Sequence, residues 1–246
     1  MNRESEKQPR LYTDLARWWP LFSPPSHYEE EAADLLPTLM TAAAPTPRTL
    51  LELGCGGGSL AYHLKGRLSL TLTDRSAEML AVSRSVNPEC EHVLGDMRSL
   101  NLNRRFDLVF VHDAIMYATE PESVVATLAT AYRHCRPGGG VVVVPDHVRE
   151  TFEPSTESGG EDAPDGSGLR YLEWVWDPDP EDHTYEAAFA FLLREPGGTT
   201  RVDSDLHRFG LFPRAAWLEW MAEAGLPAQS RMDPWGRDVF VGTRGS

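Results

Sequence analysis

A glycine-rich segment at residues 54–58 carries the strongest chemical signal in the chain. It follows a short apolar run, residues 49–53, and precedes a helical pattern, which indicates a turn from a buried strand into a helix. Glycine suits such a turn because the backbone bends sharply and a ligand can approach the main chain where no Cβ intervenes. In an open sheet of parallel strands, this loop lies at the carboxyl end of a strand, where ligands bind. We therefore expect the segment to contact a ligand.

The spacing of the glycines distinguishes two kinds of nucleotide ligand. A dinucleotide-binding loop has the pattern G-x-G-x-x-G, but Ser59 occupies the third glycine position. The pattern E-x-G-x-G-x-G fits instead, with Glu52, Gly54, Gly56 and Gly58 at its fixed positions. An NAD-dependent oxidoreductase with an unusual glycine loop stays open as an alternative.

Two acidic residues follow the next two predicted strands. Asp74 lies twenty residues after Gly54, where a carboxylate can accept hydrogen bonds from both ribose hydroxyls of a nucleoside. Asp96 and Met97 follow the third strand, and the sequence RPGG at residues 136–139 precedes the fifth. In this order, the glycine loop and these landmarks resemble the class I S-adenosylmethionine (SAM) methyltransferases.

The resemblance implies an α/β, Rossmann-like fold with a seven-stranded, mostly parallel sheet whose last strand, around Phe240, is antiparallel. It also implies SAM as the cofactor, with Asp96 on the adenine amino group and an apolar neighbour against the ring. Glu52 and the acidic surroundings would favour the positive sulfonium, and backbone N–H groups near Gly58 would take the carboxylate of the cofactor. The expected cofactor-binding residues are Glu52, Gly54, Gly56, Gly58, Asp74, Arg75, Met79, Asp96, Met97 and His112.

Alternating strand and helix patterns must position these residues. Uninterrupted apolar strands between helices predict a parallel sheet that is covered on both faces. The predicted strands are residues 49–53, 68–73, 92–94, 106–111, 141–144 and 239–241, and the predicted helices are residues 59–65, 76–85, 122–133 and 213–224. Residues 11–40 are mainly helical in pattern, with a break at residues 23–26.

The composition divides the chain into four parts. We expect an N-terminal helical lid at 1–45, a SAM-binding core at 46–145, a β-rich insertion or substrate lobe at 146–210, and the C-terminal part of the core at 211–246. Residues 150–186 hold twelve Asp and Glu but one Arg. Two strands at 185–193 and 199–205, joined by a turn at 195–198, indicate an antiparallel arrangement in the insertion.

Three residues are candidates for orienting the acceptor and removing its proton. Asp113 and Tyr117 follow the fourth predicted strand, although a helix cap and a packing aromatic are equally good interpretations. On a strand, Asp203, Asp205 and His207 share one face, and a histidine can take a proton from an amine or hydroxyl near neutral pH. The alternatives for this cluster are a solvated strand face or a salt bridge with Arg208 or Arg214.

Aromatic residues favour a small-molecule acceptor. His207 with the following Leu-Phe pair and the aromatic N-terminal helices resemble small-molecule N-methyltransferases, including those that dimethylate amino sugars in antibiotic pathways. Tyr117 stands where those enzymes place a histidine. An aromatic and acidic wall suits a cationic amine, so we expect an amine rather than a hydroxyl. The expected acceptor-binding residues are Tyr12, Trp19, Tyr28, Tyr171 and Trp174, with core packing as the alternative.

Composition excludes several other partners and sites. The chain has 246 residues with 23 Lys and Arg against 37 Asp and Glu, so its net charge of -14 argues against nucleic acid. No apolar run reaches membrane-spanning length, and the first ten residues are polar, so we expect a cytoplasmic protein, a monomer or a homodimer. Asp146, His147 and acids of the insertion form no recognised ligand pair, so we expect no metal. A non-catalytic SAM-binding protein is the remaining alternative.

Overall fold

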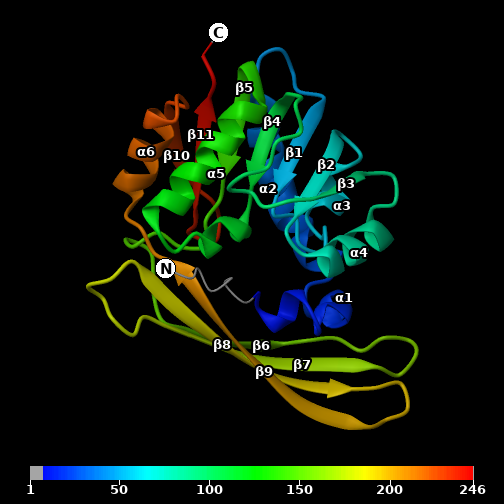
Figure 1. Cartoon of the computed structure of the whole chain (residues 1–246). Helices are drawn as coiled ribbons and strands as arrows, with labels where there is room; N and C mark the ends of the chain where they lie inside the picture. Colours follow the sequence, from blue (N-terminus) through cyan, green and yellow to red (C-terminus); the bar gives the residue numbers. More distant parts are fainter. Residues whose placement is uncertain (1–7, 246) are drawn as a thin grey trace, which may run out of the picture.

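A computed structural model describes residues 8–245 as a Rossmann-like core with a small antiparallel sheet beneath it (Figure 1). The first seven residues of the predicted lid, and residue 246 of the predicted C-terminal part, lie outside the described residues.

The core is a seven-stranded sheet in the order β10-β11-β5-β4-β1-β2-β3. Strands β1 to β5 run parallel to one another, and β11 is antiparallel to both β5 and β10. The predicted fold class is confirmed, including the reversed last strand with Phe240. The strands are β1 Thr49–Leu53, β2 Ser69–Asp74, β3 Glu91–Leu94, β4 Phe106–Val111, β5 Cys135–Val143, β10 Ala228–Met232 and β11 Asp238–Thr243.

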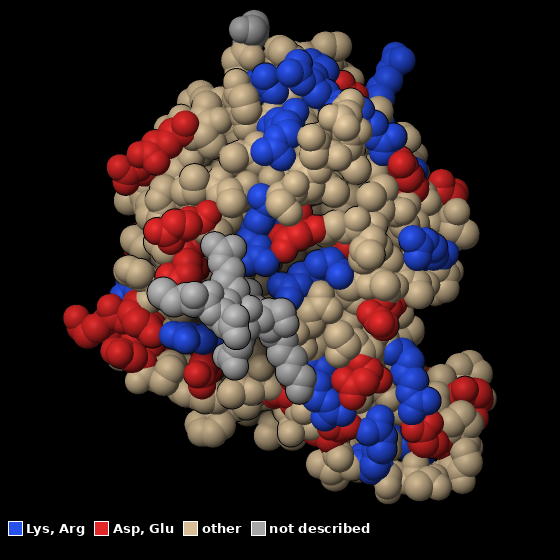
Figure 2. Space-filling view, viewed as in Figure 1, with Lys and Arg blue, Asp and Glu red and all other residues tan. Residues whose placement is uncertain are grey.

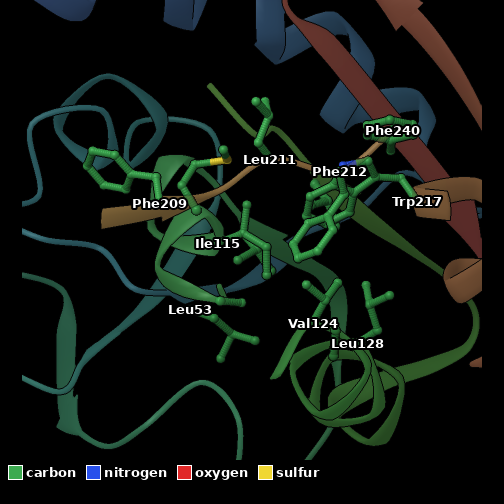
Figure 3. Packing of buried hydrophobic residues seen from close by; sticks show 14 of the residues in the cluster. Leu53, Ile115, Val124, Leu128, Phe209, Leu211, Phe212, Trp217 and Phe240 are labelled. Carbon is green, nitrogen blue, oxygen red and sulfur yellow. The ribbon is translucent and has the colours of Figure 1, made fainter. Parts of the chain in front are cut away.

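Helices cover both faces of this sheet, which is why its central strands are apolar on both sides. Successive side chains of a strand point to opposite faces, so Leu51 and Val109 pack on the face of α5 and α6, while Leu50 and Phe110 pack on the face of α2 and α3. Figure 3 shows the first of these cores, where Trp217 of α6 meets Phe240. The helices are α2 Glu29–Thr41, α3 Ala61–Leu64, α4 Ala77–Val86, α5 Pro121–His134 and α6 Arg214–Glu223.

The insertion forms a four-stranded antiparallel sheet in the order β6-β7-β8-β9. Its strands are β6 Ser155–Gly159, β7 Gly168–Trp176, β8 Thr184–Arg194 and β9 Thr200–Gly210. Sequence patterns predicted only the last two strands, β8 and β9. The first strand, β6, is short, polar and exposed, so it lacks an apolar alternation that could predict it. One face of the sheet turns toward the core, and the carboxyl ends of the parallel strands point at it (Figure 1).

The N-terminal segment lies between the core and the small sheet. It is a series of short turns rather than one long helix, because Pro20, Pro24 and Pro25 interrupt the backbone hydrogen bonds that a continuous helix needs. Its elements are η1 Arg10–Tyr12, η2 Ala16–Trp18, α1 Trp19–Phe22 and η3 Pro25–Tyr28, and a further short helix, η4 Asp113–Tyr117, follows β4.

Candidate active site

A cavity of about 630 Å³ opens where the core, the small sheet and the N-terminal segment meet. The ends of β1, β2 and β4 contribute Glu52, Asp74 and His112 to its wall. The inner face of the small sheet contributes aromatic side chains, and the N-terminal segment closes another side with Tyr12 and Trp19. The site is therefore enclosed by three parts of the chain that are distant in sequence.

The glycine loop adopts a conformation that other residues could not share. Gly54 has φ +79°, and a Cβ placed on it would lie 2.3 Å from the Cβ of Ala114. A Cβ on Gly57 would lie 2.2 Å from Cδ1 of Trp19, so this indole ring rests directly on the loop. A Cβ on Gly58 would clash with Asn87 and Ser83 at 2.4 Å. The glycines thus permit close packing around the backbone that borders the cavity.

Asp74 ties the loop to the start of the next helix. Its carboxylate accepts hydrogen bonds from the backbone N–H of Gly56 at 2.9 Å and of Ser76 at 2.8 Å. Burial raises the pKa of Asp74, although these hydrogen bonds oppose the rise. Ser76 caps α4 by accepting a hydrogen bond from the backbone N–H of Met79 at 3.0 Å. The terminal methyl carbon of Met79 lies 3.7 Å from where a Cβ on Gly56 would be. Met79 is not among the residues that line the cavity.

Asp96, Met97 and Arg75 line the same end of the cavity as Asp74. The Asp96 carboxylate pairs with Arg98 at 2.7 Å, and this hydrogen bond lowers the pKa of Asp96. An ionised carboxylate beside an apolar side chain suits a ring that carries an amino group.

Glu52 is a buried carboxyl group with one oxygen that lacks a partner in the described part of the chain. Only 3% of the residue is exposed, and its Oε2 has no hydrogen-bond partner within residues 8–245. Burial raises the pKa of Glu52 to about 7, and the neighbouring His112 opposes that shift. Because an unpartnered buried carboxyl group is costly, a cation or donor in the cavity would satisfy it.

A buried ionic network holds His112 and Asp113. His112 Nε2 lies 2.6 Å from Glu31 and its Nδ1 lies 3.1 Å from Asp113. Arg237 pairs with Glu31 and, at 2.8 Å, with Asp233. Burial raises the pKa of Glu31, but the hydrogen bond from His112 and the charges of His112 and Arg237 outweigh it, giving about 2. The network joins α2, the loop after β4 and the β10–β11 hairpin around one side of the cavity.

Four side chains form a continuous hydrogen-bonded chain on the opposite side. The hydroxyl of Tyr117 lies 2.8 Å from the Tyr12 hydroxyl and 2.7 Å from Nδ1 of His207. Nε2 of His207 lies 2.9 Å from a carboxylate oxygen of Asp205. His207 is 1% exposed, and burial raises the pKa values of Tyr12 and Tyr117 above their usual range, so both phenols keep their protons. The structure thus brings together Tyr12, Tyr117 and His207, which sequence patterns singled out separately.

The remaining predicted aromatics divide into two groups. Trp19 and Tyr28 line the cavity, where the Tyr28 hydroxyl lies 2.7 Å from Ser23 Oγ. Tyr171 packs on Phe22 with ring centroids 4.8 Å apart, and Trp174 is 56% exposed and packs on Trp176. Neither Tyr171 nor Trp174 is among the cavity-lining residues.

Several cavity residues had no clear signal in the sequence. Asp146 follows the fifth parallel strand, and its position there was the one usable clue. Burial, and then the adjacent Asp113, raise the pKa of Asp146 well above its usual value. Glu173 and Tyr185 come from the small sheet. Arg237 also lines the cavity, and only the tertiary fold brings it to its partner Glu31, which is not a lining residue.

No cluster of three metal-ligating side chains occurs in the part of the chain that the structure describes. Likewise, none of the helices between residues 8 and 245 is long and apolar enough to cross a membrane.

Comparison with known proteins shows which family this chain belongs to. A family described as "Methyltransferase domain" matches residues 50–139, which include the glycine loop, Asp74 and Asp96. The dTDP-3-amino-3,4,6-trideoxy-alpha-D-glucopyranose N,N-dimethyltransferase of Streptomyces venezuelae is 30% identical over 218 residues, covering 87% of this chain and 90% of the relative. The chain belongs to the class I SAM-dependent methyltransferases.

Solved structures agree with this assignment. Streptomyces venezuelae DesVI superposes on the methyltransferase with a TM-score of 0.83 and 26% identity, over 95% of this chain and 99% of that chain. The SAM-bound amino pentose methyltransferase CalS10 of Micromonospora echinaspora has a TM-score of 0.75 at 23% identity, over 99% of this chain and 100% of that chain, which supports the fold. The predictions of the fold, of SAM as cofactor and of a small-molecule methyltransferase are confirmed. The oxidoreductase and non-catalytic alternatives gain no support.

The residues of the cavity fit SAM. The glycine loop borders the cavity, Asp74 and Asp96 provide acceptors, and Glu52 offers to a positive charge an oxygen, Oε2, that has no partner in the described residues. When bound, SAM supplies a methyl group on a positively charged sulfur. The chain itself must align the acceptor, exclude water and remove a proton.

Proposed function

We propose that this methyltransferase transfers methyl groups to the amine of an amino sugar in natural-product biosynthesis. Two relatives that match most of the chain are N,N-dimethyltransferases of dTDP-linked 3-amino sugars, one from Streptomyces venezuelae and one, 29% identical, from Streptomyces fradiae. The observation that carries the choice of an amine over a hydroxyl is the chemistry of the cavity wall outside the predicted cofactor contacts.

That wall combines carboxyl groups with aromatic rings. Asp113, Asp146 and Glu173 line it together with Tyr12 and Tyr185. Burial, followed by Glu157, raises the pKa of Glu173 to about 7, so its charge is destabilised without a cation nearby. An ammonium group entering the cavity favours the ionised carboxylates and contacts the aromatic faces. A neutral hydroxyl would gain neither interaction.

The hydrogen-bonded side chains supply a route for the amine proton. An ammonium must lose a proton before its nitrogen can attack, and the methylated product must lose another to become neutral. We assign Tyr12 and Tyr117 to orient the amine and His207 to receive the proton, because both phenols stay protonated while Nδ1 of His207 lies within hydrogen-bond distance of Tyr117. Asp113 and Asp146 hold the acceptor by charge.

The test is an acceptor panel read by release of S-adenosylhomocysteine. It pairs dTDP-linked and free 3-amino sugars with their 3-hydroxy counterparts. We expect turnover with the amines, and a loss of about 100-fold in kcat for Tyr117→Phe with unchanged affinity for SAM. Tyr62→Phe, on an exposed side chain of α3, is the matched control. Turnover of the hydroxyl sugars alone would refute the proposal.

We also propose a cytoplasmic protein that is a monomer or homodimer and has no nucleic-acid partner. In support, basic and acidic side chains are interspersed on the face shown in Figure 2, whereas nucleic-acid binding needs a continuous basic surface. Light scattering tests the oligomeric state, and electrophoretic mobility with duplex DNA and RNA tests the absence of a nucleic-acid partner.

A further inference from the structure

We propose that Asp205 is the positioning residue of the proton relay and that the N-terminal segment completes this relay when it closes on the small sheet. Asp205 holds His207 in the tautomer whose Nδ1 accepts a proton, and the same carboxylate binds the backbone N–H of Leu11. This inference rests on the proposed methylation of an amine but extends it to a residue outside the cavity wall.

The hydrogen bonds of Asp205 fix the tautomer of His207. Its Oδ2 lies 2.9 Å from His207 Nε2 and 2.8 Å from the backbone nitrogen of Leu11, and its Oδ1 lies 3.2 Å from the backbone nitrogen of Leu206. All three partners are nitrogens, and the two backbone groups can only donate, as suits an ionised carboxylate. Nε2 therefore carries the proton, and Nδ1 is free to accept the hydroxyl hydrogen of Tyr117 at 2.7 Å.

Asp205 and His207 are buried, so little water competes with the hydrogen bond between them. The side chains of Asp205 and His207 are 8% and 1% exposed. Phe189 and Phe209 flank the imidazole with ring centroids at 4.9 and 5.8 Å, so little water competes for its nitrogens. The titratable side chains that contact the ring are Asp205, Tyr117 and Tyr12. An imidazolium formed there would be stabilised by the Asp205 carboxylate.

The proton moves from the ammonium group to His207 without leaving a charge on either phenol. The ammonium N–H bond breaks and its proton passes to the Tyr117 oxygen as the Tyr117 proton passes to Nδ1 of His207, and the new Tyr117 hydroxyl donates a hydrogen bond to the Tyr12 oxygen. Both phenols end neutral, the amine keeps its electron pair for attack on the methyl carbon, and the positive charge ends on the imidazole beside Asp205.

Closure of the N-terminal segment brings Tyr12, which accepts the hydrogen bond of the Tyr117 hydroxyl, into place. Leu11, whose N–H binds Asp205, directly precedes Tyr12. The carbonyl of Tyr12 accepts a hydrogen bond from Ser76 Oγ at 2.6 Å, which anchors the segment to the core. Arg10 pairs with Asp203, two residues before Asp205 on the same face of β9. The segment that covers the glycine loop is therefore also held against the relay.

The test compares Asp205→Asn, Asp205→Glu and Asp203→Asn. Nitrogen-15 spectra of histidine-labelled protein report which ring nitrogen of His207 carries the proton, and need no acceptor. We expect the Nε2–H tautomer in the unaltered protein and in Asp203→Asn, which loses the tie to Arg10 but keeps Asp205. In Asp205→Asn we expect a change of tautomer, faster hydrogen exchange at Leu11, and kcat lower by about 100-fold with an unchanged KM for SAM. Asp205→Glu should restore part of kcat.

Two results would overturn the proposal. One is an Nδ1–H tautomer in the unaltered protein, which needs no variant to fold. The other is an unchanged tautomer and kcat in Asp205→Asn. If no amine is methylated by the unaltered protein, the proposed function fails, while the tautomer and the exchange of Leu11 still decide the role of Asp205.

Discussion

Single carboxyl groups in this cavity differ in role because their hydrogen bonds differ. Asp74 receives two backbone N–H groups and holds the loop, whereas Glu52, one strand away, has an oxygen without a partner in the described chain. Strand ends could be read from the sequence, so both residues were predicted as cofactor contacts. The groups that act on the ionisation of Glu52 could not be read, because His112 and Asp113 belong to the distant segment that follows β4.

Replacing Asp74 by alanine should weaken SAM binding. The variant removes an acceptor for a bound nucleoside and also frees the N–H groups of Gly56 and Ser76. Hydrogen bonds to charged groups contribute about 1.5–3 kcal/mol, so we expect the Kd for SAM to rise roughly 10- to 100-fold. Isothermal titration measures it, and Asp74→Asn, which keeps one acceptor oxygen, should lose less. An unchanged Kd in the alanine variant would remove Asp74 from the cofactor site.

Strands and helical segments differ in how clearly the sequence predicts them. The central strands β1 and β4 and the end of β5 are mostly apolar and buried, which predicts strands directly, whereas residues 136–140 at the start of β5 have the composition of a turn. The strands β6 and β10 lie at sheet edges and contain Ser, Glu, Gln and Arg, which give no such pattern. The N-terminal segment was predicted as a helical lid, but its place on the glycine loop depends on contacts such as that of Trp19 with Gly57.

Removing the indole of Trp19 should loosen this segment. The ring lies against Gly57 and packs on Tyr12 with centroids 5.6 Å apart, so it connects the loop to the relay. For Trp19→Ala we expect faster hydrogen exchange over residues 10–22 and a rise of about tenfold or more in the Kd for SAM, because truncating a packed aromatic residue forfeits its burial. Trp174→Ala, on the outer face of the small sheet, is the matched control. Equal exchange rates in the two variants would show that Trp19 does not hold the segment.

At the scale of the whole molecule, acidity is concentrated around the cavity as well as on the surface. The net charge of -14 was evident from composition, and so was the acidic insertion. The fold brings together Asp113 of η4, Asp146 after β5, and Glu173 of β7 in one enclosed space. Because these elements are distant in sequence, the sequence alone did not show this convergence. Packing two sheets around a cavity therefore buries Asp146 and Glu173, whose pKa values are raised by burial, so a cation that enters the cavity favours their ionised forms.

Stability without ligand should therefore decline as the pH rises toward 8. Burial raises the pKa of Glu52 from 4.5 to about 7, so the folded chain binds this proton more tightly than the unfolded chain does. The resulting stabilisation is fully present below pH 4.5 and is lost as the pH passes through about 7. Its size is on the order of 1–3 kcal/mol, which urea unfolding between pH 5 and pH 8 can resolve.

Glu52→Gln isolates the contribution of this one residue. The amide does not titrate, so the variant should lose part of the decline between pH 5 and pH 8, while Glu173 keeps its own contribution of the same sign. Glu219→Gln, on an exposed position of α6, controls for the loss of one surface charge. If Glu52→Gln and Glu219→Gln follow the same curve as the unaltered protein, Glu52 is ionised throughout. Other groups of the protein would then offset the cost of burying its charge. Oε2 of Glu52 would give no reason for a cation to bind beside the glycine loop.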